Sequence, residues 1–183
     1  VCDTHNIDPW ELIRLANHHP RVNILQPGAG VGGHCIAVDP WFIVARDKKN
    51  TNLIQTARKV NENKTNWVIN QIKIKVADLV TKSDKKSTIA CLGLAFKPDI
   101  DDLRESPALK VAETLNYEGY DLLVVEPNIK SHKSLKLVEL KEAIDKSDII
   151  AILVKHKEFN NPIIIKQLVN KFALDFCGTI VEQ

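Results

Sequence analysis

The sequence lacks methionine, has few aromatic residues and carries almost balanced charge. None of its 183 residues is Met, and only 5% are Phe, Trp or Tyr. Its 25 basic and 23 acidic residues give a net charge of +2, too small for a general nucleic-acid-binding protein. The chain begins at Val1, and together with the missing methionine this favours a piece of a longer protein over an intact gene product.

The four cysteines also lack the spacing of a metal site. Cys2, Cys35, Cys91 and Cys177 form no Cys-x-x-Cys pair and no Cys/His ligand pattern, so we expect no metal and a reduced, cytoplasmic protein. No apolar run approaches the roughly 20 residues needed to cross a membrane, and we expect no signal peptide. With 44% hydrophobic residues, the chain can bury one medium core or two small ones, and we expect neither nucleic acid nor membrane as a partner.

The run PGAGVGGHCIAVDP, residues 27–40, is the most informative segment. It places Cys35 behind four glycines and four residues ahead of Asp39. Glycines let a backbone turn tightly and approach a ligand with free amide groups, and a cysteine in such a loop can act as a covalent nucleophile. The alternative is a flexible surface turn followed by a buried thiol. Four glycines in so short a run favour the active-site interpretation.

The same run contains the pattern GxGxxG, at Gly28, Gly30 and Gly33. In dinucleotide-binding proteins this pattern follows a strand and opens a helix within a βαβ unit. Here no convincing strand precedes Gly28, and Pro40 interrupts any helix that begins at Gly33. We therefore do not interpret the pattern as an NAD fingerprint.

The first 80 residues are expected to be mainly helical. Asp8 and Pro9 mark the start of a helix over about 9–18, with Asp8 as its N-cap. Asp39 and the proline after it repeat this pattern, which makes helix capping an alternative role for Asp39.

A long helix is expected over residues 52–80, because apolar residues recur there every three, four or five positions. A helix of this length is typical of a domain spine or a dimer core. We expect Trp67 and Ile72 to lie at or near the interface with a second copy of the chain. The polar run TKSDKKS, residues 81–87, is interpreted as a linker.

From residue 88 to 183 the pattern changes to β-α-β-α-β-α-β. The apolar runs TIACLGLAF, DLLVVEP, DIIAILV and ALDFC alternate with helical stretches that begin at or near Pro107, Leu137 and Pro162. Continuous apolar strands separated by helices indicate a small parallel sheet covered on both faces. The predicted fold class is therefore α/β: a central helical domain over 1–80, then a small Rossmann-like domain over 88–183.

Ligands of such sheets bind at the carboxyl ends of the strands. Those ends carry Phe96-Lys97-Pro98, Glu126-Pro127-Asn128 and Lys155-His156. A lysine at a loop tip is usually solvated, which is our interpretation of Lys155. Lys97 differs, because FKPDIDDLRESP places two cations among four acids before a helix N-terminus that could hold an anion. This segment predicts a phosphate site.

Two strings, HPRVNILQPGAGVGGHCIAVDPWF and GLAFKPDIDDLRESP, resemble the UDP-glucose/GDP-mannose dehydrogenase family. The first is most similar to the members that act on UDP-N-acetyl-D-mannosamine. The resemblance implies that residues 1–80 form the family's central dimerisation domain and residues 88–183 its C-terminal UDP-sugar-binding domain. It also implies that the NAD-binding domain, with the catalytic lysine and asparagine, lies outside this chain.

The resemblance implies a two-step oxidation of the primary alcohol of a UDP-sugar to a uronate, with two NAD and an enzyme-bound aldehyde. Cys35 matches the nucleophile: a carbonyl held as a thiohemiacetal can lose a second hydride, and the resulting thioester is open to water. Asp39 matches the carboxylate that assists this water. Five further residues match substrate-binding positions of the family: His19, Arg21, Gly32, Phe96 and Lys97. Arg104 matches a residue that contacts NAD. In the family, the arginine that matches Arg21 reaches into the site of a neighbouring subunit.

The implied substrate is UDP-N-acetyl-D-mannosamine, used in surface polysaccharide synthesis. UDP-GlcNAc and UDP-glucose are the alternative substrates. The alternative to an enzyme is a non-catalytic module that binds a nucleotide-sugar and forms a dimer. A homodimer and a UDP-sugar are therefore the expected partners.

Overall fold

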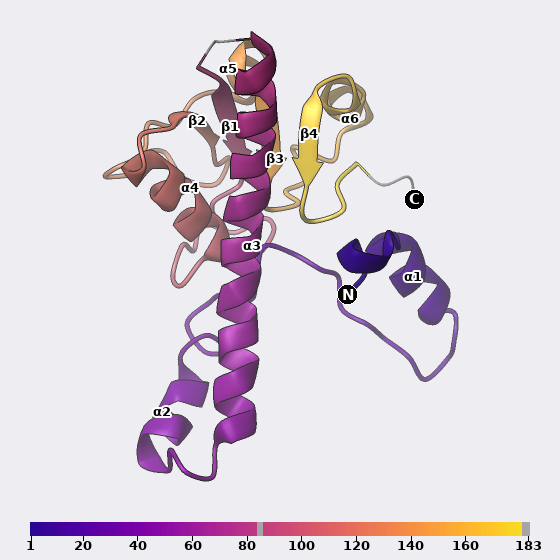
Figure 1. Ribbon diagram of the computed structural model, residues 1–183, viewed down its shortest axis with the longest axis vertical. Coiled ribbons are helices and arrows are strands. Elements are labelled where there is room, and N and C mark those ends of the chain that lie inside the picture. The colour runs from indigo at the N-terminus through magenta and orange to yellow at the C-terminus, as the bar shows by residue number, and fades with distance from the viewer. Residues whose placement is uncertain (84–85, 181–183) are drawn as a thin grey trace.

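The computed structural model describes residues 1–83 and 86–180 (Figure 1). One long helix runs past a four-stranded sheet with its C-terminal half, and its N-terminal half extends away from the sheet beside a short helix (Figure 1). In chain order, the elements are a 3-10 turn (Asp3–His5), α1 (Pro9–Ala16), α2 (Asp39–Arg46), α3 (Asn52–Ser83), β1 (Thr88–Leu92), α4 (Pro107–Tyr117), β2 (Asp121–Val125), α5 (Leu140–Lys146), β3 (Ile149–Ile152), α6 (Pro162–Val169) and β4 (Phe172–Asp175).

The sheet has the strand order β2-β1-β3-β4, and every neighbouring pair is parallel. The predicted alternation of strands and helices is thus confirmed. Side chains of β1 alternate between two hydrophobic cores: Ile89 and Cys91 face α3 and α4, whereas Ala90 and Leu92 face α5 and α6. Because both faces are covered, the strands read as continuous apolar runs.

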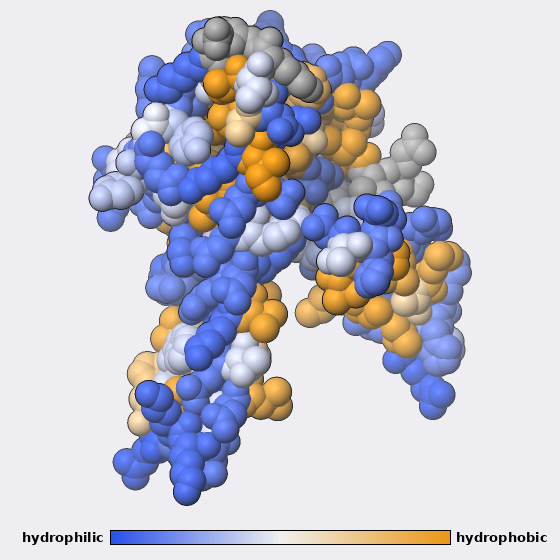
Figure 2. Space-filling view, in the orientation of Figure 1, coloured by the Kyte–Doolittle hydropathy of each residue, from blue (hydrophilic) through white to orange (hydrophobic). Residues whose placement is uncertain are grey.

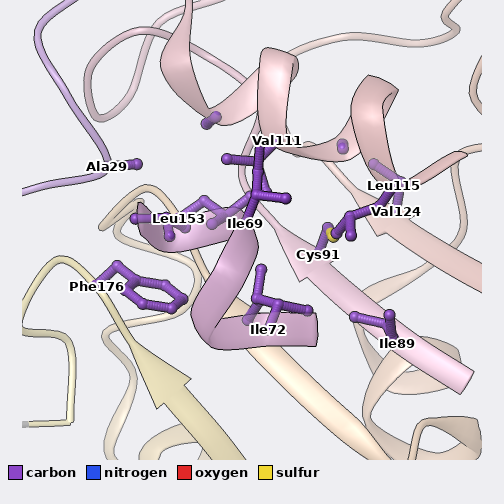
Figure 3. Packing of buried hydrophobic residues seen from close by; sticks show 14 of the residues in the cluster. Ala29, Ile69, Ile72, Ile89, Cys91, Val111, Leu115, Val124, Leu153 and Phe176 are labelled. Carbon is purple, nitrogen blue, oxygen red and sulfur yellow. The ribbon is translucent and has the colours of Figure 1, made fainter. Parts of the chain in front are cut away.

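The C-terminal half of α3 belongs to the core of the sheet domain. Val68 and Ile72 are fully buried, and Figure 3 shows Ile69 and Ile72 pointing toward the cluster that includes Val111 of α4. Ile72 therefore packs within the chain and cannot contact a second copy directly, whereas a dimer interface near it stays a prediction. Trp67 is half-buried and packs edge-on against Phe176, with 6.0 Å between the ring centroids. Trp67 and Ile72 thus both pack against residues of the same chain.

The ends of two helices refine the expectations from the sequence. Helix α1 has the expected cap, since Asp8 accepts hydrogen bonds from the N–H groups of Trp10 and Glu11, but it ends at Ala16. Helix α3 continues to Ser83, three residues into the expected linker, and residues 84–85 lie outside the described part of the chain.

Asp39 does not cap α2, which corrects the alternative role considered for it. The helix starts at Asp39 itself, so its N-cap position is Val38, which makes no side-chain capping hydrogen bond. The carboxylate of Asp39 is consequently left exposed at the first turn.

Among the helices within residues 1–83 and 86–180, none is both long and apolar enough to cross a membrane.

Candidate functional site

The glycine-rich loop is attached to the long helix α3 at two points. Asn61 donates from Nδ2 to the carbonyl of Val31 (2.9 Å) and accepts from the N–H of the same residue (2.8 Å). One turn further along, the hydroxyl of Thr65 donates to the carbonyl of Ala29 at 3.1 Å. The rigid helix therefore fixes the loop that leads to Cys35. As expected, no strand precedes these glycines, so they do not form a dinucleotide fingerprint.

The same loop docks on the segment between β1 and α4. The N–H of Gly33 donates to the carbonyl of Arg104 at 3.1 Å. Gly32 is buried so tightly that a Cβ there would lie 2.7 Å from Cδ of Pro107 and 3.0 Å from Cβ of Phe96. Gly33 has φ +92°, in the left-handed region that favours glycine, and packs against the Phe96 ring. The glycines thus permit contact between the two segments expected to carry the site.

Cys35 is the exposed thiol of this chain. Its carbonyl accepts hydrogen bonds from the N–H groups of Val38 and Asp39 (3.0 and 2.8 Å), which form the turn into α2. Cys91 is fully buried, and that burial raises the pKa of its thiol to about 12. Burial, followed by the charge of Asp175, likewise raises the pKa of Cys177 to about 12. The remaining thiol, Cys2, is half-buried.

The segment on which the cysteine loop docks carries a charged pair, Asp102 and Arg104. Arg104 donates to both oxygens of Asp102, with the shortest distance 2.7 Å, and these hydrogen bonds lower the pKa of Asp102 to about 2. The pKa of Arg104 is raised, mainly by its hydrogen bonds to Asp102 and the charge of that carboxylate. His34 lies with Nδ1 3.8 Å from Asp102. The side chain of Arg104 remains 63% exposed, so its guanidinium can also meet a ligand.

A pocket of about 570 Å³ opens where the glycine-rich loop, α3 and the carboxyl edge of the sheet meet. Three lysines reach it from different parts of the chain: Lys64 from α3, Lys97 after β1 and Lys155 after β3. Its other lining residues are Gln26, Pro27, Gly28, Ala29, Gly30, Val31, Asn61, Ala95, Phe96, Pro98, Pro107, Ala108, Leu153, Val154, Cys177 and Gly178. The pocket is therefore cationic, with apolar walls.

The three lysines differ in their surroundings. Lys97 is exposed, with Nζ 5.6 Å from the centroid of the Phe96 ring. Lys64 lies over the Trp67 ring, with Nζ 3.6 Å from its centroid, and burial lowers the pKa of this lysine. Lys155 is half-buried and donates to the carbonyl of Gly178 at 2.6 Å, so our interpretation of it as a solvated loop lysine is wrong.

Some residues expected at the site are brought together and others are not. Phe96 and Lys97 line the pocket, while Gly32 contacts Phe96 behind it. His19 and Arg21 are exposed in the segment after α1. The N–H of Arg21 donates to Nδ1 of His19 at 3.2 Å. Neither residue lines the pocket.

Sequence reasoning missed Lys64 and the structural roles of Glu126 and His156. Lys64 lies within a long amphipathic helix, where nothing in the sequence separates a pocket lysine from a solvated one. Glu126 and His156 follow β2 and β3, the two strands on either side of β1, at the carboxyl edge where ligands of parallel sheets bind. Their position at this edge was the signal in the sequence that could have identified them.

The fold and the pocket at the carboxyl edge of the parallel sheet are typical of α/β proteins that bind small molecules there. Two family models match the chain: the UDP binding domain of the UDP-glucose/GDP-mannose dehydrogenase family over residues 90–181, and the central domain of the same family over residues 1–63. The chain therefore belongs to the UDP-glucose/GDP-mannose dehydrogenase family.

Its relatives include the UDP-N-acetyl-D-mannosamine dehydrogenases of Campylobacter jejuni, 56% identical over 167 residues, and of Escherichia coli strain K12, 54% identical over 168 residues. Both alignments cover 87% of this chain, and the chain spans 40% of the length of these relatives.

Solved structures agree with this assignment. The UDP-D-ManNAc dehydrogenase from Pyrococcus horikoshii matches with a TM-score of 0.79 and 30% identity, covering 98% of this chain and 43% of that one. The UDP-N-acetyl-mannosamine dehydrogenase from Staphylococcus aureus matches with a TM-score of 0.77 and 33% identity, covering 100% and 43% respectively.

Proposed function

We propose that this chain is the thiol-bearing and UDP-binding part of an NAD-dependent UDP-sugar 6-dehydrogenase, and that its substrate is UDP-N-acetyl-D-mannosamine. The observation that carries the proposal is the junction between the two domains. There, the loop that ends in exposed Cys35 docks on the segment that supplies Phe96 and Lys97 to a cationic pocket. The choice of sugar is supported by the relatives, several of which are named for UDP-N-acetyl-D-mannosamine.

The pocket suits the nucleotide half of such a substrate. The ammonium groups of Lys64, Lys97 and Lys155 provide positive charge for a diphosphate, and the apolar walls accept a base or sugar ring. Lys97 is the most exposed of the three and is our choice for direct phosphate contact. The volume of about 570 Å³ falls within the usual range for small-molecule sites.

Cys35 supplies the covalent chemistry in this proposal. Its thiolate adds to the aldehyde carbon of the half-oxidised sugar to give a thiohemiacetal, and loss of a hydride from that carbon gives a thioester. Water then attacks the thioester carbon, which releases the carboxylate product and returns the thiolate. Asp39 begins the helix directly after the Cys35 turn with an exposed carboxylate, and in our proposal it accepts a proton from this water.

The family uses NAD, which accepts hydride when bound. Neither matched model is an NAD-binding domain. Within this chain, Arg104 fits an NAD contact, because it lies in the segment on which the Cys35 loop docks and its largely exposed guanidinium can pair with a phosphate.

We further propose a homodimer formed through α2 and the N-terminal half of α3. Five large apolar side chains are exposed on or beside these helices: Ile36 (66%), Phe42 (70%), Ile43 (55%), Leu53 (84%) and Val60 (62%). Figure 2 shows hydrophobic side chains on the part of the molecule that extends away from the sheet domain. Burying them against a second copy removes this apolar surface from water. In this proposed dimer, Arg21 serves the neighbouring subunit's site.

Calorimetric titration of the 183-residue chain with UDP tests the proposal. Lys97→Ala should weaken binding about tenfold, the loss expected for a charge-assisted hydrogen bond of ~1.4 kcal/mol. Lys110→Ala is the matched control, because Lys110 is an exposed lysine of α4 that does not line this pocket. Absence of UDP binding, or an equal loss in both variants, would contradict the assignment of the pocket.

A further inference from the structure

Glu126 and His156 form a buried polar pair at the carboxyl edge of the sheet. Both side chains are 0% exposed, and Nε2 of His156 lies 3.0 Å from Oε2 of Glu126. Glu126 directly follows β2 and His156 lies four residues after β3, so the pair spans the end of β1 between them. Neither residue lines the cationic pocket.

The pair holds both ends of the short segment that carries Phe96 and Lys97. Oε2 of Glu126 accepts from the N–H groups of Leu94 and Ala95, at 2.7 and 3.0 Å. Nδ1 of His156 accepts from the N–H of Asp99 at 2.9 Å. The two pocket residues lie between these points of attachment.

Hydrogen bonding determines the protonation of the pair. Nδ1 of His156 faces two donors, the N–H of Asp99 and Nδ2 of Asn128 at 3.1 Å, so the proton of the neutral ring is on Nε2 and is donated to Glu126. Burial alone would raise the pKa of Glu126, but hydrogen bonds from His156 and from the N–H groups of Leu94 and Asn128 lower it to about 2.

Two other interpretations of this cluster are weaker. Oxygens of Asp99 and Glu158 lie within 4.8 Å of each other and of a His156 ring nitrogen, but a metal at Nδ1 would have to displace two hydrogen bonds. A purely stabilising role is also unconvincing, since buried charged groups such as the Glu126 carboxylate are often no more stabilising than apolar residues of similar size.

Backbone strain at Asp99 indicates a specific geometry. Asp99 has φ +60°, which is uncommon for a residue with a side chain. His156 accepts from its N–H, and its own Oδ1 accepts from the N–H of Lys157 at 3.0 Å. The turn after Lys97 is therefore held in a strained form by contacts with the segment after β3.

We infer that Glu126 and His156 are positioning residues for nucleotide binding: they fix the segment 94–99 so that Lys97 faces the pocket. The inference rests on the proposed function, because it assigns the pocket to a UDP-sugar. The pair acts through the backbone and through Lys97, without touching the nucleotide.

Two variants of the 183-residue chain test this: Glu126→Gln, which removes the carboxylate, and His156→Gln, which removes the imidazole acceptor. The matched controls are Glu118→Gln, at a surface ion pair with Lys73, and His132→Gln, in the loop after β2. Amide hydrogen exchange by NMR should be at least tenfold faster at Leu94 and Ala95 in Glu126→Gln. In His156→Gln the faster amide should be that of Asp99. Amides of β1 should keep their protection in both variants, which shows that the domain remains folded.

UDP affinity, measured by calorimetry, provides the second readout. Each pair variant should bind UDP about tenfold more weakly, and this factor should fall below threefold in a Lys97→Ala background, because the pair acts through Lys97. Unchanged exchange at residues 94–99, or the same loss with and without Lys97, would overturn the inference. If Glu126→Gln unfolds, His156→Gln decides, since it leaves the carboxylate and its backbone donors in place.

The two proposals fail in different ways. A wild-type chain that does not bind UDP contradicts the proposed function, whereas a wild-type chain that binds UDP with the same affinity as both pair variants contradicts the inference alone.

Discussion

Asn61 of α3 makes hydrogen bonds to both the N–H and the carbonyl of Val31, at 2.8 and 2.9 Å, as a neighbouring strand would. This contact joins the long helix to the glycine-rich loop four residues before Cys35. The C-terminal half of the same helix is buried in the core of the sheet domain, so α3 links the position of the thiol to the position of the pocket.

Cys35 should be the only cysteine that reacts rapidly with an alkylating agent. It is exposed, whereas burial raises the thiol pKa of Cys91 and Cys177 to about 12, which leaves almost no thiolate at neutral pH. Limiting iodoacetamide followed by peptide mapping checks this in the native protein. Equal labelling of Cys91 would mean that the sheet domain opens readily or is packed differently.

Gly32→Ala should destabilise the chain by about 1–3 kcal/mol, because its new methyl group would overlap Pro107 and the carbonyl of Glu105. Gly28→Ala is the matched control: a Cβ at Gly28 meets nothing within 4 Å, and its φ is not in the left-handed region. Thermal or denaturant unfolding compares the two variants. Equal stability of both would show that the glycine-rich loop is not docked on the sheet domain.

The contribution of Glu126 to stability should depend on pH. Its pKa of about 2 in the folded state lies below the ordinary value of 4.5, so the native state favours the ionised form. The resulting stabilisation, about 3 kcal/mol, is complete above pH 4.5 and is lost as the pH falls towards 2.

The difference in unfolding free energy between wild type and Glu126→Gln should therefore shrink by about 1 kcal/mol between pH 6 and pH 3.5. Subtracting the variant removes the contribution of other acids, including Asp102, whose pKa is also lowered. A difference that stays constant over this range would mean that Glu126 is not held as a buried carboxylate.

Phe42→Glu should convert a dimer to a folded monomer in sedimentation experiments, because it places a charge within the exposed apolar surface of α2. Tyr117→Glu is the control, since this aromatic residue is 93% exposed at the end of α4, on the sheet domain. An unchanged dimer in Phe42→Glu, or dissociation in both variants, would move the interface elsewhere.

The sequence predicted the sheet domain well because its signals are local. Continuous apolar runs such as Ile149–Ile152 specify strands buried on both faces, and Ser106 with Pro107 marks the start of α4, where Ser106 accepts from the N–H of Leu109. The cysteine loop was also recognisable, since the spacing of its glycines can be read directly from the chain.

Partners that are distant in sequence were not predictable in the same way. An apolar stripe on α3 shows that a face is buried but not against what, so Ile72 was assigned to a second copy although it packs within the chain. Lys155 appeared to be a solvated loop residue, because its acceptor, the carbonyl of Gly178, lies 23 positions away. The sequence suggested Asp39 as the N-cap of α2, but the helix begins one residue earlier than that assignment requires, so Asp39 is its first residue.

Protection of Cys35 from alkylation by a UDP-sugar that carries an aldehyde at C6 tests the central claim most directly. The measurement follows the rate of Cys35 modification by iodoacetamide in the 183-residue chain, with the C6 aldehyde of UDP-N-acetyl-D-mannosamine, with UDP alone and with no ligand. We predict saturable protection by the aldehyde that exceeds the effect of UDP, because the thiol adds to the carbonyl while the pocket binds the nucleotide. Lys97→Ala should shift this protection to higher ligand concentration. Equal rates under all three conditions, in a chain that binds UDP, would show that Cys35 does not face the sugar and would contradict its role as the nucleophile.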